Sequence, residues 1–123
     1  SSINDNLFGN IHYSPTPDFD LLLDAYKKSQ ELGYTTHCGQ VHSSDQFYSE
    51  MDPKVFENLQ KYGVLCVEME SYGLFTVARK YGKRALGVFT ISDSLVSNES
   101  DSAENRQSAY TQMMTLALEV APE

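Results

Sequence analysis

Apolar residues recur every three to four positions in four segments of the chain, which is the spacing that places side chains on one face of a helix. Asp18 and Asp52 precede the first two segments, where they can cap a helix. Gly33, Gly63 and Gly82 follow the first three segments, where they can end a helix. The predicted helices cover residues 19–32, 53–62, 71–81 and 103–118.

Three further segments have the composition of strands. Residues 34–44 hold several Thr, Val and Tyr residues in loose alternation, and residues 64–67 form a short apolar run. Residues 85–91 are almost continuously apolar, which is typical of a strand covered on both faces of a parallel sheet. Residues 1–18 are polar and rich in turn formers, so we expect a loop there.

The order of these elements, α-β-α-β-α-β-α, predicts an α/β fold with a mostly parallel sheet. Three strands make a thin sheet, and its edge would expose unpaired backbone groups. Residues 1–6 contain no initiator Met and no recognisable element start. We therefore expect residues 1–123 to be the C-terminal part of a single domain whose N-terminal strands are missing, or else to have a partner that covers the edge.

Composition narrows the choice of partners. The formal net charge is −8 and no cluster of Lys and Arg offsets it, so binding to nucleic acid or to an anionic membrane is disfavoured. No apolar run approaches the roughly 20 residues that a membrane-spanning helix needs. Cys38 and Cys66 are isolated thiols, which indicates a reducing, cytoplasmic setting.

Acidic residues stand at the carboxyl ends of two predicted strands. Glu68 and Glu70 follow residues 64–67, and Asp93 follows residues 85–91. Because parallel strands end at the same edge of a sheet, we expect these carboxylates to share a ligand-binding crevice, where the first two would hold a polyhydroxylated ligand. The alternative for the first two is that one caps the following helix and the other is solvated.

Arg106 lies near the start of the last predicted helix and can fold back over Asp93. A neighbouring Arg favours the ionised form of a carboxyl group, whereas a cleft with little water disfavours it. The alternative for Arg106 is a solvated side chain that pairs with Glu104 or Glu99.

Other kinds of site receive less support. Phe47 and Tyr48 are neighbouring aromatics in a polar loop, which suggests a partner with a flat ring. Cys38 and His42 would share one face of a strand while His37 takes the other, so three ligands do not converge and no metal site is predicted. The sequence contains neither a Gly-rich phosphate loop nor a nucleophile elbow.

Four motifs closely resemble segments of the bacterial hexameric purine nucleoside phosphorylases, in unbroken order along essentially the whole chain. Residues 63–73 resemble their ribose-binding segment, and residues 90–94 resemble the strand end that carries their catalytic acid. Residues 103–107 resemble the segment that opens their last helix, and residues 43–48 resemble the loop whose Phe packs on the base.

The resemblance implies phosphorolysis, in which a purine nucleoside and phosphate give the free base and ribose 1-phosphate. It implies that Glu70 accepts hydrogen bonds from the ribose hydroxyls and that the backbone of Met69 assists. Glu68 would lie at the purine–ribose side of the same seam, and Phe47 would cover the face of the purine.

The resemblance also implies roles in bond cleavage. Asp93 would be the general acid, which donates a proton to purine N7 as the base leaves. Arg106 would swing toward Asp93, and Ser92 would position Asp93 or the base. Ser94 stands where the family usually has His, a departure that we expect to alter contacts to the base without removing the acid.

For the whole protein, the resemblance implies a partial three-layer α/β/α nucleoside phosphorylase fold, a role in cytoplasmic purine salvage, and a homo-oligomer, namely a hexamer built from dimers. Phosphate would be a co-substrate, and no cofactor or metal is expected. The family's phosphate-binding Gly and Arg residues lie in an N-terminal half outside residues 1–123, so we expect the nucleoside half of a site here. The alternatives are a related nucleoside hydrolase or uridine phosphorylase, and an inactive fragment that only binds or assembles.

Overall fold

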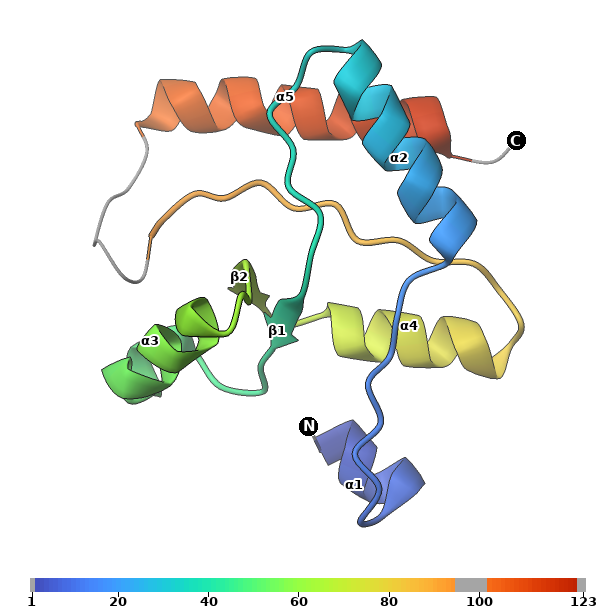
Figure 1. Cartoon of the computed structure of the whole chain (residues 1–123), viewed down its shortest axis with the longest axis vertical. Helices are drawn as coiled ribbons and strands as arrows, with labels where there is room; N and C mark the ends of the chain where they lie inside the picture. Colours follow the sequence, from blue (N-terminus) through green and yellow to red (C-terminus); the bar gives the residue numbers. More distant parts are fainter. Residues whose placement is uncertain (1, 95–101, 122–123) are drawn as a thin grey trace. The chain divides into compact units, whose positions relative to one another are not determined.

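The computed structural model describes residues 2–94 and 102–121, which gather into two compact units. The first unit comprises Ser1–Asp18 and Gly39–Leu86, and the second comprises Phe19–Cys38 and Gly87–Glu123. The helices and strands of the described residues, drawn in Figure 1, are α1 (Ser2–Phe8), α2 (Phe19–Glu31), β1 (Val41–Ser43), the 3₁₀ helix η1 (Tyr48–Glu50), α3 (Pro53–Lys61), β2 (Cys66–Glu68), α4 (Ser71–Lys80) and α5 (Ala103–Val120).

The first unit contains a two-stranded parallel sheet. Val41 lies opposite Cys66, and Ser43 lies opposite Glu68. The backbone N–H of Ser44 donates to the carbonyl oxygen of Glu68 over 2.8 Å, so the pairing continues to the very end of β2. Because the two strands run parallel, both end at the same edge of the sheet, and α3 lies between them in the chain. This strand–helix–strand order confirms the predicted parallel α/β arrangement.

The four helices predicted from apolar spacing are confirmed as α2, α3, α4 and α5. Local signals account for their ends. Asp52 caps α3, since its side chain accepts a hydrogen bond from Lys54 N at 2.9 Å, and Ser102 caps α5 by accepting from Asn105 N at 3.1 Å. Gly63 follows α3 with a φ of 86°, a left-handed conformation that favours glycine.

Of the predicted strands, one is wrong in extent and one does not form among the described residues. The strand predicted over residues 34–44 shrinks to β1, and residues 85–91 form neither helix nor strand in the described part of the chain. A strand requires a neighbouring backbone to pair with, and apolar composition does not supply one. The carbonyl oxygen of Ala85 accepts from Asp18 N at 2.9 Å, but no regular pairing continues from this contact among the described residues.

The prediction of a loop over residues 1–18 is wrong at its start, where α1 forms. Asn4, in this helix, is only 7% exposed, and its side chain holds the helix in place through contacts with distant residues. Its Nδ2 donates to the carbonyl oxygen of Ile11 at 3.0 Å, and its Oδ1 accepts from Tyr13 N at 2.8 Å and from the Tyr72 hydroxyl at 2.9 Å. The side chain thereby ties α1 to the following loop and to α4.

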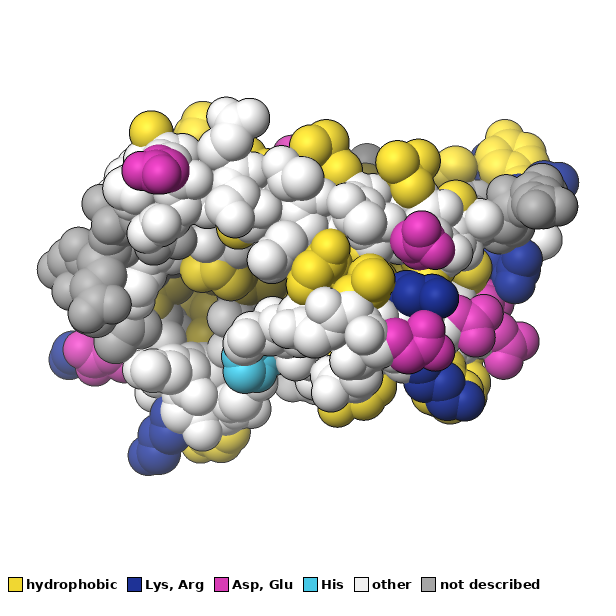
Figure 2. Space-filling view, turned by 90° about the horizontal axis from the view of Figure 1, so that it is seen from above, with side chains coloured by type: hydrophobic (Ala, Val, Ile, Leu, Met, Phe, Trp, Pro, Cys, Tyr) yellow, Lys and Arg dark blue, Asp and Glu magenta, His cyan; other side chains and the backbone are white. Residues whose placement is uncertain are grey.

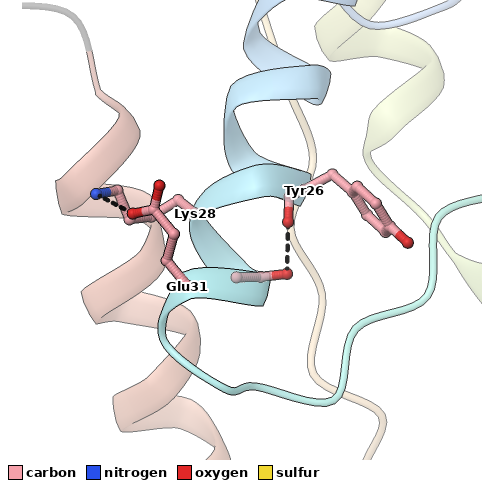
Figure 3. Close-up of polar contacts among 4 residues, drawn as sticks. Tyr26, Lys28 and Glu31 are labelled. Carbon is pink, nitrogen blue, oxygen red and sulfur yellow. Dashed lines mark hydrogen bonds and ion pairs between the residues drawn. The ribbon is translucent and has the colours of Figure 1, made fainter.

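In the second unit, α2 and α5 lie against each other (Figure 1). Leu21, Ala25 and Ser29 are buried at four-residue spacing, which places them on one face of α2, and Leu116 is buried on α5. The Ser29 hydroxyl is satisfied within its own helix, because it donates to the carbonyl oxygen of Tyr26 over 3.0 Å (Figure 3). A fully buried serine is thus accommodated without an unpaired polar group.

Lys28 and Glu31 form an ion pair of 3.0 Å along α2, as Figure 3 shows. The hydrogen bond to Glu31 and the charge of its carboxylate raise the pKa of Lys28 above the ordinary value. Ion pairs in contact with solvent contribute little to stability, so the buried face of α2 is what holds this helix.

Large hydrophobic side chains remain exposed in both units. Leu74, Val77 and Tyr81 follow one another at helical spacing along α4 and its C-terminal residue, and Met114 and Leu118 do so on α5. Figure 2 shows hydrophobic side chains in yellow at the surface, with acidic and basic groups among them. Within residues 2–94 and 102–121, no helix combines the length and apolar character required to cross a bilayer.

Replacement of Asn4 by Ala is expected to destabilise the first unit. The variant loses the contacts to Ile11, Tyr13 and Tyr72 and leaves these partly buried polar groups without this partner, which we expect to cost about 1–3 kcal/mol. Urea unfolding followed by circular dichroism measures the change in free energy. Asn6→Ala, on the exposed side of α1, is the matched control and should change stability by less than about 0.5 kcal/mol. Equal effects of the two variants would contradict the role of Asn4.

Candidate functional site

The first part of the candidate site is the connection between β2 and α4. β2 ends at Glu68 and α4 begins at Ser71, so Met69 and Glu70 form a two-residue link between strand and helix. The pattern of the sequence accounts for this geometry, because a short apolar strand is followed at once by helical spacing. The link therefore lies at the sheet edge where β1 and β2 both end.

Glu68 is enclosed by hydrogen-bond donors of its own chain. Its Oε2 accepts from the backbone N–H groups of Glu70 and Ser71, both at 2.7 Å, and its Oε1 accepts from the Ser71 hydroxyl. Partial burial raises the pKa of Glu68, but the hydrogen bonds from Ser71, the two backbone amides and the Ser43 side chain outweigh this effect. The pKa of Glu68 therefore lies below its ordinary value.

Met69 and Glu70 are both exposed, in contrast to Glu68. The backbone N–H of Met69 donates to Oε2 of Glu70 at 3.2 Å. Glu70 occupies the N-cap position of α4 but makes no capping hydrogen bond with its side chain. Its carboxylate thus keeps acceptor capacity that a ligand carrying hydroxyl groups could use.

Phe47 belongs to the loop that leaves the same sheet edge after β1. Ser44 is buried and shapes this loop, since its hydroxyl accepts from Gln46 N at 3.0 Å and donates to the carbonyl oxygen of Gln46 at 2.9 Å. Phe47 precedes η1, and 64% of its surface is exposed. An exposed aromatic ring on a loop with a fixed base can cover the face of a flat ligand.

The second part of the candidate site is an ion pair in the second unit. Arg106, in the first turns of α5, places its Nη2 3.3 Å from Oδ1 of Asp93. The Ser92 hydroxyl donates to the other oxygen, Oδ2, at 2.9 Å. Each oxygen of the Asp93 carboxylate therefore accepts from one side chain, and the predicted contact between Arg106 and Asp93 is confirmed. The alternative partner Glu99 lies outside the described residues.

The Arg106 side chain is only partly engaged by this pair. Its Nε is buried and has no hydrogen-bond partner among the described residues. Asp93 remains partly exposed, with 44% of its side chain accessible. The carboxylate is thus both held by the chain and open to contact from solvent.

The predicted site residues fall into two groups. The first unit contains Phe47, Glu68, Met69 and Glu70, whereas the second contains Ser92, Asp93 and Arg106. Within the first unit, the parallel pairing of β1 and β2 brings the base of the Phe47 loop to the end of β2. The common crevice for all the acids stays a prediction.

Ser43 and Ser71 are the contributors that the sequence alone did not single out. Ser71 is only 4% exposed and contacts Glu68 through both its amide and its hydroxyl. A Ser three residues after an acid at a strand-to-helix junction is the signal that could have revealed it. Ser43 has no such local signal, because the pairing of β1 with β2 brings it to Glu68.

The structure offers no evident metal centre in the part that it describes. No group of three or more His, Cys, Asp and Glu side chains in residues 2–94 and 102–121 is arranged to hold an ion. Cys38 and Cys66 are free thiols. Burial raises the pKa of the Cys66 thiol, and the charge of Glu68 raises it further, so this thiol is a weak nucleophile.

Comparison with known proteins gives a consistent result along nearly the whole chain. The family model described as phosphorylase superfamily matches residues 4–121. The chain is 45% identical over 121 residues to the DeoD-type purine nucleoside phosphorylases of Anoxybacillus flavithermus and Geobacillus stearothermophilus, covering 98% of this chain and 51% of each relative. It is 46% identical to that of Caldanaerobacter subterraneus, covering 52% of that relative. The chain spans about half the length of the curated relatives it matches.

Replacement of Glu68 by Gln is expected to destabilise the protein in a pH-dependent manner. Because the pKa of Glu68 is lower in the folded than in the unfolded chain, its ionised form stabilises the fold above the unfolded-state pKa of about 4.3. This stabilisation is lost as the pH falls through the folded-state pKa. The variant should therefore be less stable at pH 7, by about 1 kcal/mol as for a lost helix cap, and this difference should shrink as the pH is lowered below the unfolded-state pKa.

Urea unfolding at several pH values measures this difference in free energy. Glu57→Gln, at an exposed position of α3, is the matched control and should show little change at any pH. A stability difference for Glu68→Gln that stayed constant from pH 7 to pH 3 would contradict the assigned charge interaction.

Proposed function

The chain belongs to the phosphorylase superfamily, and we propose that it supplies the nucleoside-binding residues of a purine nucleoside phosphorylase. The observation that carries the proposal is the Asp93 carboxylate held between Arg106 and Ser92. An acid supported in this way, on a chain related to enzymes of that name, suits proton transfer to a leaving purine.

In the proposed reaction, Asp93 donates its proton to purine N7 while the bond between ribose C1′ and purine N9 breaks. The electrons of that bond pass to the base, which leaves in neutral form, and an oxygen of phosphate forms the new bond to C1′. Asp93 is left as a carboxylate. The hydrogen bonds from Arg106 and Ser92 support the proposal because they stabilise this product of proton transfer.

Glu70 is the proposed acceptor for the ribose hydroxyls, together with the backbone of Met69. Its exposed carboxylate and free acceptor capacity favour this role over one for Glu68. A negative charge beside the sugar also stabilises the oxocarbenium-like character that develops as the glycosidic bond breaks. Phe47 would cover one face of the purine, which its exposure and position on the loop favour.

Phosphate is the proposed co-substrate, and the chemistry needs no other cofactor, because a protonated purine leaves without redox or metal assistance. We further propose that the protein works as a homo-oligomer in the cytoplasm. The exposed apolar residues Leu74, Val77 and Tyr81 favour assembly, and the free thiols favour a reducing compartment. A single-chain mass in sedimentation equilibrium would contradict the assembly.

Nucleoside binding and base release test the proposed function directly. The purified chain should bind inosine or adenosine in calorimetry and bind uridine at least about tenfold more weakly, since the loop carrying Phe47 would match a purine. Any release of free base, followed by chromatography, should require phosphate. Release at an equal rate without phosphate would assign a hydrolase, preferential binding of uridine would assign a pyrimidine enzyme, and the absence of both binding and release would overturn the proposal.

Asp93→Asn tests the general acid in a protein of full family length. A suitable background is a chimaera in which this chain replaces the segment it matches in the Geobacillus stearothermophilus relative. Because Asn cannot donate the proton, kcat should fall by about 10²–10⁴-fold while KM changes far less. Asp24→Asn, at an exposed position of α2, is the control and should retain activity. Loss of nucleoside binding in step with kcat would refute the assigned role.

A further inference from the structure

The two glutamates of the link after β2 differ in how much hydrogen-bonding capacity they have left. An ionised carboxylate offers about four lone-pair positions. Three donors of the chain bond to Glu68, namely the amides of Glu70 and Ser71, both to Oε2, and the hydroxyl of Ser71, to Oε1. Most of the accepting capacity of Glu68 is therefore taken up within the chain, although its position in the sequence made it a candidate contact.

Three different elements meet around Glu68. Ser43 is the last residue of β1, Glu68 is the last residue of β2, and Ser71 is the first residue of α4. The Ser43 oxygen also accepts from the backbone N–H of Tyr72, in the first turn of α4, at 3.2 Å. The carboxylate and these hydroxyls thus join the ends of both strands to the start of the helix.

The two-residue link between these points has little freedom. At its start, the carbonyl oxygen of Glu68 accepts from Ser44 N at 2.8 Å. At its end, the side chain of Glu68 holds the backbone amides of Glu70 and Ser71 at 2.7 Å each. Because both ends are fixed, the backbone from which the Glu70 side chain projects is fixed as well, and that side chain remains exposed.

We propose that Glu68, held by Ser71 and by the amide of Glu70, is a positioning residue that aims Glu70 at the ribose hydroxyls and does not itself contact the nucleoside. The inference rests on the proposed function, since it assumes that Glu70 accepts from ribose. It differs from the expectation drawn from the sequence, in which Glu68 lay among the substrate contacts.

A double-mutant cycle separates positioning from direct contact. The purified 123-residue chain and its variants are titrated with inosine and with 2′,3′-dideoxyinosine, which lacks the hydroxyls that Glu70 would bind. Glu70→Gln and Glu68→Gln should each weaken inosine binding by about tenfold, as expected for an impaired hydrogen bond to a charged group. Each should change dideoxyinosine binding less than about twofold. The double variant should bind inosine no more weakly than Glu70→Gln alone, because Glu68 acts through Glu70.

Two milder variants keep the test meaningful if Glu68→Gln folds poorly. Ser71→Ala removes the hydroxyl that donates to Glu68, and Ser43→Ala removes the oxygen that accepts from the Tyr72 amide at the start of α4. Each should weaken inosine binding without a matching loss for dideoxyinosine. Amide NMR signals of Glu70 and Ser71 should shift in Glu68→Gln and in both serine variants. Glu57→Gln on α3 is the control and should leave affinity and these signals unchanged.

Each result bears on a distinct claim. If the double variant lost inosine affinity by the product of the two single losses, Glu68 would contact the nucleoside directly. This result would overturn the inference but not the proposed function. Equal losses for inosine and dideoxyinosine would indicate a purely structural role and also overturn it. A wild-type chain that binds neither nucleoside would overturn the proposed function together with this inference.

Discussion

The hydrogen bonds of the Glu68 carboxylate determine how the chain passes from β2 into α4. The first amides of a helix lack partners within the helix, and the N-cap residue Glu70 does not provide one with its side chain. Glu68, two positions before this N-cap residue, accepts from the amides of Glu70 and Ser71 instead. Its negative charge lies at the N-terminal end of the helix, where the helix dipole favours it. Partial burial opposes ionisation, so the charge is sustained by the donors that surround it. The positions of the Glu70 and Ser71 amides follow from this balance.

A second constraint fixes the surroundings of this link within the same unit. Tyr72, in the first turn of α4, donates its hydroxyl to Asn4, and Tyr13 packs edge-on against its ring with centroids 6.4 Å apart. Burial of Tyr72 raises the pKa of its phenol, and the charges of Tyr13 and Asp5 add to this effect, so the hydroxyl remains a donor at neutral pH. The start of α4 is thus held from two sides, by the strand end and by α1.

The sequence predicted the helices well because their signals are local. Asp52 and Ser102 cap helices through amides two or three residues away, and Gly63 ends one by its own conformation. The failures concern interactions between distant positions. Residues 85–91 have the composition of a buried strand but find no regular partner among the described residues, and α1 depends on the contact of Asn4 with Tyr72, 68 positions along the chain. Local pattern carries no information on such pairings.

The candidate site was predictable to the same degree and for the same reason. Acids at strand ends stand out in sequence, but their division of labour depends on which donors reach them. Glu68 accepts three hydrogen bonds from its own chain, Glu70 is open to solvent, and Asp93 is held on both oxygens while remaining partly exposed. Three carboxylates of similar intrinsic acidity therefore differ in how far their own chain engages them. Their hydrogen-bond donors, brought together by tertiary structure, create this difference, and the proposed division into positioning, sugar binding and proton transfer is based on it.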